Sequence, residues 1–249
     1  MDDYQKSSFA AKTTKGHLIE HDIYSKGTGP VVVIIQELPG IGPETLHLAD
    51  KFEAEGFTVV LPHLFGPLGK IAVGGNLLRV MCMRREFRLL AKGKTSPVVD
   101  WLRALCRELK EDHNVPGVAT IGMCLTGNFA ISLMADDAVL AGVASQPSMP
   151  VNDQNALHMS DGDVAAIRDK LDQVGPMKAY RIAGDHMCKA EKFASLDRAF
   201  NNDRERIELN TLPGKGHSVL TLDFVDEDGH PTKEAFDNIV TYFRKQLAV

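Results

Sequence analysis

A cysteine between two glycines is the residue in this chain best placed to do chemistry. Cys124 lies in the segment GMCLTG (residues 122–127), which follows an apolar run over residues 115–121 and precedes another over residues 128–134. This order predicts a buried strand, a sharp turn and a helix, with the thiol at the tip of the turn. The amino-terminal end of a helix favours a thiolate. The pattern indicates a nucleophile for covalent acyl chemistry, with a buried and inert cysteine as the alternative.

An acid and a base follow the cysteine in the order of a nucleophile–acid–base triad. Asp185 follows a strand-like segment at residues 177–183, and His217 lies in a glycine-rich loop after the next one at residues 206–210. Because α/β sheets build their sites at the carboxyl ends of strands, both side chains should lie near Cys124. His217 would move the proton of the thiol, and Asp185 would orient the imidazole. A helix cap for Asp185 and a surface position for His217 are the alternatives.

The elements that must position these side chains alternate between strands and helices. Continuous apolar runs predict buried strands at residues 31–35, 57–62, 115–121, 138–144, 177–183 and 206–210. Amphipathic spacing predicts helices at residues 43–55, 97–110, 161–171, 191–200 and 232–246. Apolar runs without alternation are typical of parallel strands covered on both faces. We therefore expect an α/β fold with a mostly parallel central sheet flanked by helices on both faces.

The composition indicates how many domains, which kinds of partner and which cellular compartment to expect. The 249 residues are 44% hydrophobic, enough for one large core, so we expect a polar tail at residues 1–15 and a single domain at residues 16–249. A formal net charge of −5 gives no reason to expect nucleic acid as a partner, and no apolar run has the length of a membrane span. The first residues lack the layout of a signal peptide. The four cysteines show no CxxC spacing, so we expect a cytoplasmic protein with reduced thiols.

The three candidate residues, together with the run Gln36-Glu37-Leu38 after the first core strand, resemble the motifs of the dienelactone hydrolase family. The resemblance covers about residues 30–245. It implies an α/β-hydrolase fold, a Cys–His–Asp triad, no metal and no cofactor, and cleavage of an ester or lactone through an acyl-enzyme. Thr126 stands where the family has a second glycine, so the helix after the turn is expected to start slightly displaced.

The resemblance also implies a role for Glu37 close to the thiol, where it would help to control the ionisation of the sulfur. A carboxylate there can accept the thiol proton, or it can disfavour the thiolate by like-charge repulsion. The backbone N–H groups of Leu38 and Leu125 would form the oxyanion hole. The alternative for Glu37 is a solvent-facing loop residue, which its place directly after an apolar strand disfavours.

A long insert separates the second core strand from the next helix. Residues 66–96 begin glycine-rich and then become basic and apolar, which is typical of a lid or substrate wall and also of a surface helix with a solvated arginine face. The run at residues 218–221 after His217 lacks the arginine that binds the substrate carboxylate in the dienelactone hydrolases that the chain resembles. Arg84, Arg85 and Arg88 in the insert are candidates to bind a substrate carboxylate, and solvated charges are the alternative.

These observations predict a hydrolase that cleaves a carboxylic ester or lactone of a small molecule, as a monomer or homodimer. Two other functions stay open. The same site could hydrolyse thioesters or phosphotriesters. The chain could also be a binding protein with an α/β-hydrolase fold that has lost its catalytic activity.

Overall fold

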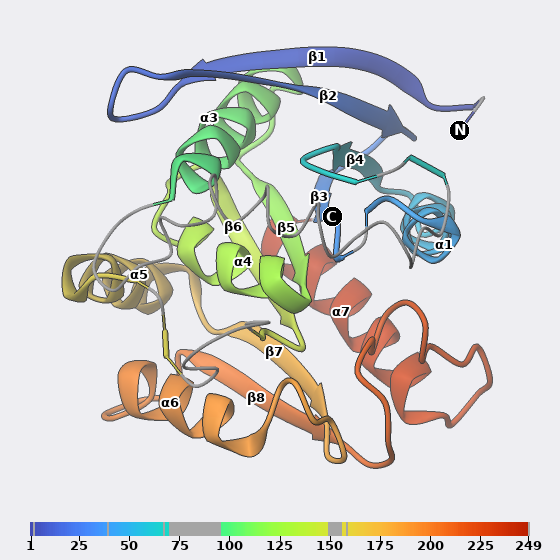
Figure 1. Ribbon diagram of the computed structural model, residues 1–249, viewed down its shortest axis with the longest axis vertical. Coiled ribbons are helices and arrows are strands. Elements are labelled where there is room, and N and C mark those ends of the chain that lie inside the picture. The colour runs from blue at the N-terminus through green and yellow to red at the C-terminus, as the bar shows by residue number, and fades with distance from the viewer. Residues whose placement is uncertain are drawn as a thin grey trace.

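An eight-stranded sheet forms the centre of the computed structural model (Figure 1). The structure describes residues 1, 3–38, 40–66, 68–69, 96–148, 156–157 and 159–248. The strands are β1 (Gln5–Lys12), β2 (Leu18–Lys26), β3 (Val31–Ile35), β4 (Thr58–Pro62), β5 (Val118–Met123), β6 (Val139–Ser145), β7 (Met177–Ile182) and β8 (Ile207–Leu212). The helices are α1 (Pro43–Ala54), α3 (Pro97–Asp112), α4 (Gly127–Leu133), α5 (Asp161–Val174), α6 (Ala190–Phe200) and α7 (Pro231–Leu247). Nearly all of the insert at 66–96, including Arg84, Arg85 and Arg88, lies outside the described residues.

The sheet is mostly parallel, and its strand order is β1-β2-β4-β3-β5-β6-β7-β8. The pairs from β4 to β8 are parallel, whereas β1 pairs antiparallel with β2, and β2 antiparallel with β4. Crossover helices join the parallel strands, as parallel pairing requires. The predicted fold class is therefore confirmed.

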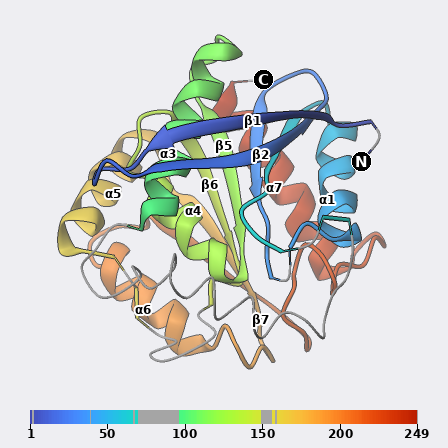
Figure 2. The ribbon, with the colours of Figure 1, turned by 45° about the horizontal axis from the view of Figure 1, so that its top comes forward.

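Helices cover both faces of the sheet, and the strand residues alternate between two apolar clusters. In β3, Val31, Val33 and Ile35 pack in the cluster that contains residues of α3, α4, α5 and α6. Val32 and Ile34 face the other cluster, which contains residues of α1 and α7. Figure 2 shows α3 and α4 on one side of β5 and β6, with α7 and α1 on the other. The continuous apolar runs in the sequence therefore mark strands buried on both sides.

The amino-terminal segment corrects the sequence analysis. Residues 5–12, expected to belong to a loose polar tail, form β1 and pair along their whole length with β2, from Gln5 opposite Ser25 to Lys12 opposite Leu18. Most β1 side chains are exposed. Because an edge strand with two largely solvated faces needs few apolar residues, its sequence carries little signal for a strand.

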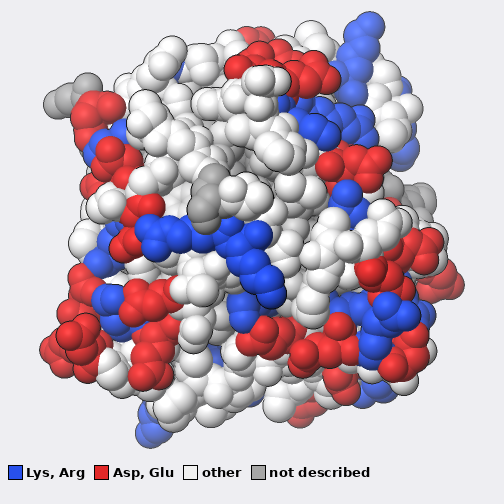
Figure 3. Space-filling view, turned by 180° about the vertical axis from the view of Figure 1, so that it is seen from behind, with Lys and Arg blue, Asp and Glu red and all other residues white. Residues whose placement is uncertain are grey.

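Acidic and basic side chains lie next to one another around a broad uncharged area on the face seen in Figure 3. Within the described ranges of the chain, none of the helices combines the length and the apolar character needed to cross a membrane.

The register of the parallel strands brings their carboxyl ends to one edge of the sheet. Ile35 at the end of β3 lies opposite Gly122 of β5, and Met123 lies opposite Ser145 at the end of β6. Ile182 at the end of β7 lies opposite Leu212 at the end of β8. The segments that follow these strands carry the candidate residues, so the register alone gathers them at this edge.

Candidate active site

The turn that carries Cys124 has the strained geometry of a nucleophile elbow. Cys124 has φ of +56°, a left-handed value that non-glycine residues rarely adopt. It opens a single 3₁₀ turn, Cys124–Thr126, that leads into α4. A β-carbon at Gly122 would overlap the backbone carbonyl of Thr126, and one at Gly127 would lie 3.0 Å from the Cα of Pro147. Close backbone approach therefore requires a glycine at position 122, and it leaves little room for a side chain at position 127.

The steric requirement at Gly122 gives a first prediction. We expect Gly122→Ala to lower the free energy of unfolding by about 3 kcal/mol, because the backbone carbonyl that the new methyl group meets cannot move aside. Gly162→Ala in α5 is the matched control, since its β-carbon would lie 3.7 Å from Ser160 Oγ, at ordinary contact distance. Urea denaturation of both variants measures the difference. Equal stabilities would show that the turn is not closely packed.

Thr126 fits the turn through its hydroxyl group. The side chain is fully buried, and its Oγ1 accepts the N–H of Met123 at 2.9 Å. The same oxygen lies 3.0 Å from the carbonyl of Ile35 and 2.9 Å from that of Met123, either of which can accept its proton. The hydroxyl of Thr126 therefore holds the turn at Cys124 against the end of β3, the strand that precedes Glu37.

His217 and Asp185 are in direct contact. His217 Nδ1 lies 2.7 Å from Asp185 Oδ2. The other carboxylate oxygen, Oδ1, accepts the backbone N–H groups of Met187 at 2.7 Å and Cys188 at 3.0 Å. A charged acceptor fixes the imidazole so that its other nitrogen, Nε2, points away from the acid. Within the described part of the chain, Nε2 is buried without a hydrogen bond of ordinary geometry.

The loops that carry the acid and the base are anchored by residues that the sequence analysis missed. The carboxylate of Asp223 accepts the backbone N–H groups of His217 at 2.7 Å and Ser218 at 2.8 Å. The buried guanidinium of Arg181 donates to the carbonyls of Ala183 at 3.1 Å and Cys188 at 2.9 Å, on either side of Asp185. Asp223 lies close to His217 in sequence and Arg181 lies inside a strand, but neither position by itself indicates these contacts.

The ionisation of the pair follows from its surroundings. Burial lowers the pKa of His217, but the hydrogen bond to Asp185 and the interaction with Cys124 outweigh it and raise the pKa to about 10. Burial raises the pKa of Asp185, yet the hydrogen bonds from His217, Met187 and Cys188 leave it below its ordinary value. The arrangement favours a charged Asp185 and a His217 that readily holds a proton beside the sulfur.

The Cys124 side chain interacts with His217 and also with Ser148, a serine that the sequence analysis did not select. Its Sγ is 3.2 Å from Ser148 Oγ, and only 8% of Cys124 is exposed. Ser148 follows β6, so the rule that located Asp185, a polar residue just beyond a buried parallel strand, could also have located it.

Glu37 is buried directly after β3 and is bound by three polar side chains. Its carboxylate accepts hydrogen bonds from Thr221, from Ser218 at 3.2 Å and from Gln146 at 3.4 Å. Only 6% of the residue is exposed, so the solvent-facing alternative does not hold. Burial raises its pKa, while these hydrogen bonds and nearby His217 partly offset the rise. Glu37 therefore lies in the same cluster as His217. Ser218, the residue after His217, links the loop after β8 to the loop after β3.

The raised pKa of Glu37 gives a second prediction. A carboxyl group whose pKa is higher in the folded state stabilises the fold below its ordinary pKa of 4.5, and this contribution is lost as pH rises through the folded value. Glu37→Gln does not titrate, so over the pH range above the ordinary pKa of 4.5 its unfolding free energy should rise relative to that of the wild type. Urea denaturation across this range tests it, with the exposed Glu205→Gln as control. A constant difference between Glu37→Gln and the wild type would contradict the burial effect.

The two backbone groups expected to form the oxyanion hole follow neighbouring strands. Leu38 is three residues beyond Ile35, and Leu125 is three residues beyond Gly122, and these two strand residues lie opposite each other. The N–H of Leu125 belongs to the 3₁₀ turn at the start of α4. Their place next to Cys124 at one sheet edge suits the proposed role.

The other described cysteines are ordinary buried thiols. Burial raises the pKa of Cys106, and it raises that of Cys188 to about 12. Cys188 Sγ donates to the carbonyl of Pro147 at 3.2 Å. Cys82 lies outside the described residues. In the parts of the chain that the structure describes, no group of three or more His, Cys, Asp or Glu side chains is placed to hold a metal ion.

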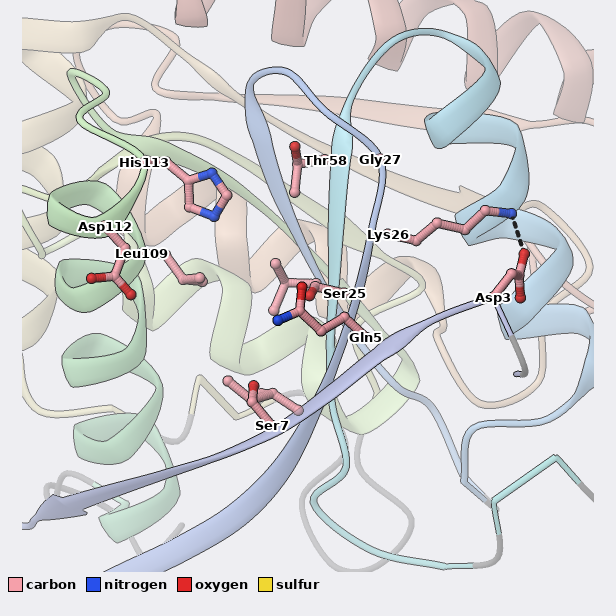
Figure 4. Close-up of a pocket in the computed structure, with 12 residues that line it drawn as sticks. Asp3, Gln5, Ser7, Ser25, Lys26, Gly27, Thr58, Leu109, Asp112 and His113 are labelled. Atoms are coloured by element: carbon pink, nitrogen blue, oxygen red, sulfur yellow. Dashed lines mark ion pairs between the residues drawn. The ribbon is translucent and has the colours of Figure 1, made fainter.

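A cavity of about 440 Å³ lies away from this cluster (Figure 4). It is lined by parts of β1, β2 and β4 and by the carboxyl end of α3, including Thr58 and His113. Thr58 is the first residue of β4, so the cavity lies at the amino-terminal edge of the parallel strands, opposite to Cys124. Lys26 at this cavity is paired with Asp3 at 2.7 Å. None of the candidate residues lines it, and we assign it no part in the proposed chemistry.

The sheet order and the strained turn after β5 define the fold as that of an α/β-hydrolase. The chain belongs to the dienelactone hydrolase family, whose model matches residues 22–247. No match is found among curated proteins.

Solved structures with the same fold include several esterases. A dienelactone hydrolase-like promiscuous phosphotriesterase from metagenomic libraries has a TM-score of 0.65 at 15% identity, covering 97% of this chain and 98% of its own. An esterase from Pyrococcus furiosus has a TM-score of 0.63 at 12% identity, covering 98% and 92%. A cold-adapted esterase from an Arctic intertidal metagenomic library has a TM-score of 0.60 at 15% identity, covering 98% and 95%. At these identities the likeness establishes the fold.

Proposed function

We propose that this protein hydrolyses carboxylic esters or lactones of small molecules, with Cys124 as the nucleophile. The observation that carries the proposal is the position of the cysteine. It lies on a left-handed turn at the start of a helix and interacts with His217, whose Nδ1 lies 2.7 Å from the buried carboxylate of Asp185. Nucleophile, base and orienting acid in this relation are what acyl transfer needs.

In the first half of the reaction, the Cys124 sulfur attacks the carbonyl carbon as a thiolate, while His217 holds the proton at Nε2. A C–S bond forms, and the carbonyl oxygen becomes an oxyanion that accepts hydrogen bonds from the N–H groups of Leu38 and Leu125. The C–O bond to the alcohol then breaks. The departing oxygen takes the proton from His217, which leaves a thioester on Cys124 and a neutral imidazole.

In the second half, neutral His217 removes a proton from water as the water oxygen attacks the thioester carbonyl. The C–S bond breaks, the carboxylic acid leaves, and the thiolate forms again beside protonated His217. Asp185 remains charged throughout and stabilises the imidazolium.

Glu37 is proposed to tune this cycle through its charge. When ionised, it stabilises the protonated His217 and disfavours negative charge on the sulfur, and when protonated it does neither. Hydrogen bonds from Thr221 and Ser218 hold Glu37, which follows β3, against the loop that carries the histidine.

Hydrolysis of a panel of chromogenic substrates tests the proposed reaction class. We expect turnover of short-chain aryl carboxylic esters and of lactones by the wild-type protein. A matched panel of aryl thioesters and aryl phosphotriesters separates this from the other reactions open to the same residues. Turnover confined to the phosphotriesters would contradict the proposal, and binding without turnover of any substrate would indicate a protein without catalytic activity.

A further inference from the structure

The three residues that follow β6, Gln146, Pro147 and Ser148, form a segment that reaches two parts of the site at once; we call it the 146–148 segment. Gln146 is fully buried and has φ of +36°, a second left-handed residue at the same sheet edge as Cys124. Its backbone N–H donates to the carbonyl of Tyr180 at 2.6 Å, and its side-chain amide lies 3.4 Å from the carboxylate of Glu37. Strain of this kind persists where the surrounding structure holds it.

Ser148, at the other end of the segment, is fixed against the elbow by its backbone. Its N–H donates to the carbonyl of Cys124 at 3.1 Å, and its own carbonyl accepts the side-chain amide of Asn128 at 3.1 Å. The residue is 1% exposed, and its Oγ lies 3.2 Å from the Cys124 sulfur. The hydroxyl is therefore held beside the sulfur by contacts that do not depend on the hydroxyl itself.

We propose that Ser148 is a further catalytic residue, whose hydroxyl donates a hydrogen bond to the Cys124 sulfur and stabilises it as a thiolate beside His217. The inference rests on the proposed function, because it assigns a role at the same nucleophile. The 146–148 segment then contacts Glu37 through Gln146 and the reacting sulfur through Ser148.

The hydroxyl acts as donor because the sulfur is the better acceptor of the two once it is charged. A thiol is a weak donor, whereas a hydrogen bond to an ionised group is about twice as strong as a neutral one. Of the titratable groups near the sulfur, His217 holds the compensating proton, and Cys188 stays neutral because burial raises its pKa to about 12. Asp185 and Glu37 both interact with His217.

The pH dependence of Cys124 alkylation by iodoacetamide tests this role without relying on ester turnover. Mass spectrometry of the peptide that contains Cys124 gives the rate at each pH for the wild type, Ser148→Ala and Ser132→Ala. Ser132 is the matched control, since it lies on α4 and its hydroxyl donates to the carbonyl of Asn128 at 3.1 Å, away from the sulfur. We expect Ser148→Ala to react about tenfold more slowly near neutral pH, with its midpoint about one pH unit higher, and Ser132→Ala to match the wild type.

A Ser148→Ala profile that coincides with the wild-type profile, or moves to lower pH, would overturn the inference, because the hydroxyl would then give the thiolate no support. The wild-type profile separates the two claims. Ordinary thiol reactivity in the wild type would contradict Cys124 as the nucleophile itself. A fast wild-type reaction with an unchanged Ser148→Ala profile would contradict only the role of Ser148.

Discussion

Replacement of Cys124 by alanine should reduce ester turnover to less than about one thousandth of the wild-type value, because it removes the atom that forms the covalent intermediate. His217 and Asp185 would remain in contact with each other, so the fold should persist. The measurement is the kcat for a short-chain aryl ester, with circular dichroism to confirm that the variant is folded.

Cys188→Ala is the matched control for this loss. Cys188 is buried close to the site, its thiol donates to a backbone carbonyl, and its raised pKa keeps it protonated at neutral pH. We expect its variant to keep turnover within a few-fold of the wild type. Equal activity of Cys124→Ala and the wild type would refute the proposed nucleophile. Loss of activity only in Cys188→Ala would show that Cys188, and not Cys124, is the nucleophile.

Asp185→Asn should lower kcat by about three orders of magnitude while leaving KM nearly unchanged. The carboxylate oxygen 2.7 Å from His217 Nδ1 fixes the imidazole tautomer and stabilises the protonated ring. An amide has no charge, and it can present an N–H group to the ring in place of an acceptor. Steady-state kinetics measure the effect, with Asp112→Asn, at the distant cavity, as the control that should leave kcat unchanged.

The Asp185→Asn variant should also differ from the wild type in how its free energy of unfolding depends on pH. Because the pKa of Asp185 is lowered in the folded state, its carboxylate stabilises the fold above its ordinary value of 3.8, and this contribution is lost as pH falls through the lowered value. The stability deficit of Asp185→Asn should therefore shrink on acidification. A deficit that stays constant would mean that the charge of Asp185 does not support the fold.

The fold could be predicted from the sequence because its parallel strands are buried on both faces. A run such as residues 31–35 has no polar position, and no other common element combines that pattern with helices on either side. The β1–β2 hairpin escaped prediction for the opposite reason. Most residues of β1 are exposed, and the pairing of Gln5 with Ser25 depends on contacts that no local pattern records.

The candidate site also has residues that the sequence predicts and residues that it does not. Cys124, Asp185 and His217 each follow a recognisable strand, so their order along the chain predicts their meeting point. The groups that hold them come from elsewhere: Arg181 points from within β7, and Asp223 binds the His217 loop from six residues away. Such supporting contacts depend on how loops close in three dimensions, and residue type alone does not reveal them.

Mass spectrometry of the protein quenched by acid during turnover of an aryl ester tests the central claim most directly. We predict an increase by the mass of one acyl group, located on the peptide that contains Cys124, that appears during turnover and disappears when the substrate is exhausted. His217→Gln should remove this adduct by slowing its formation. Turnover of the ester with no acyl group on Cys124, or with the acyl group on another residue, would contradict the account.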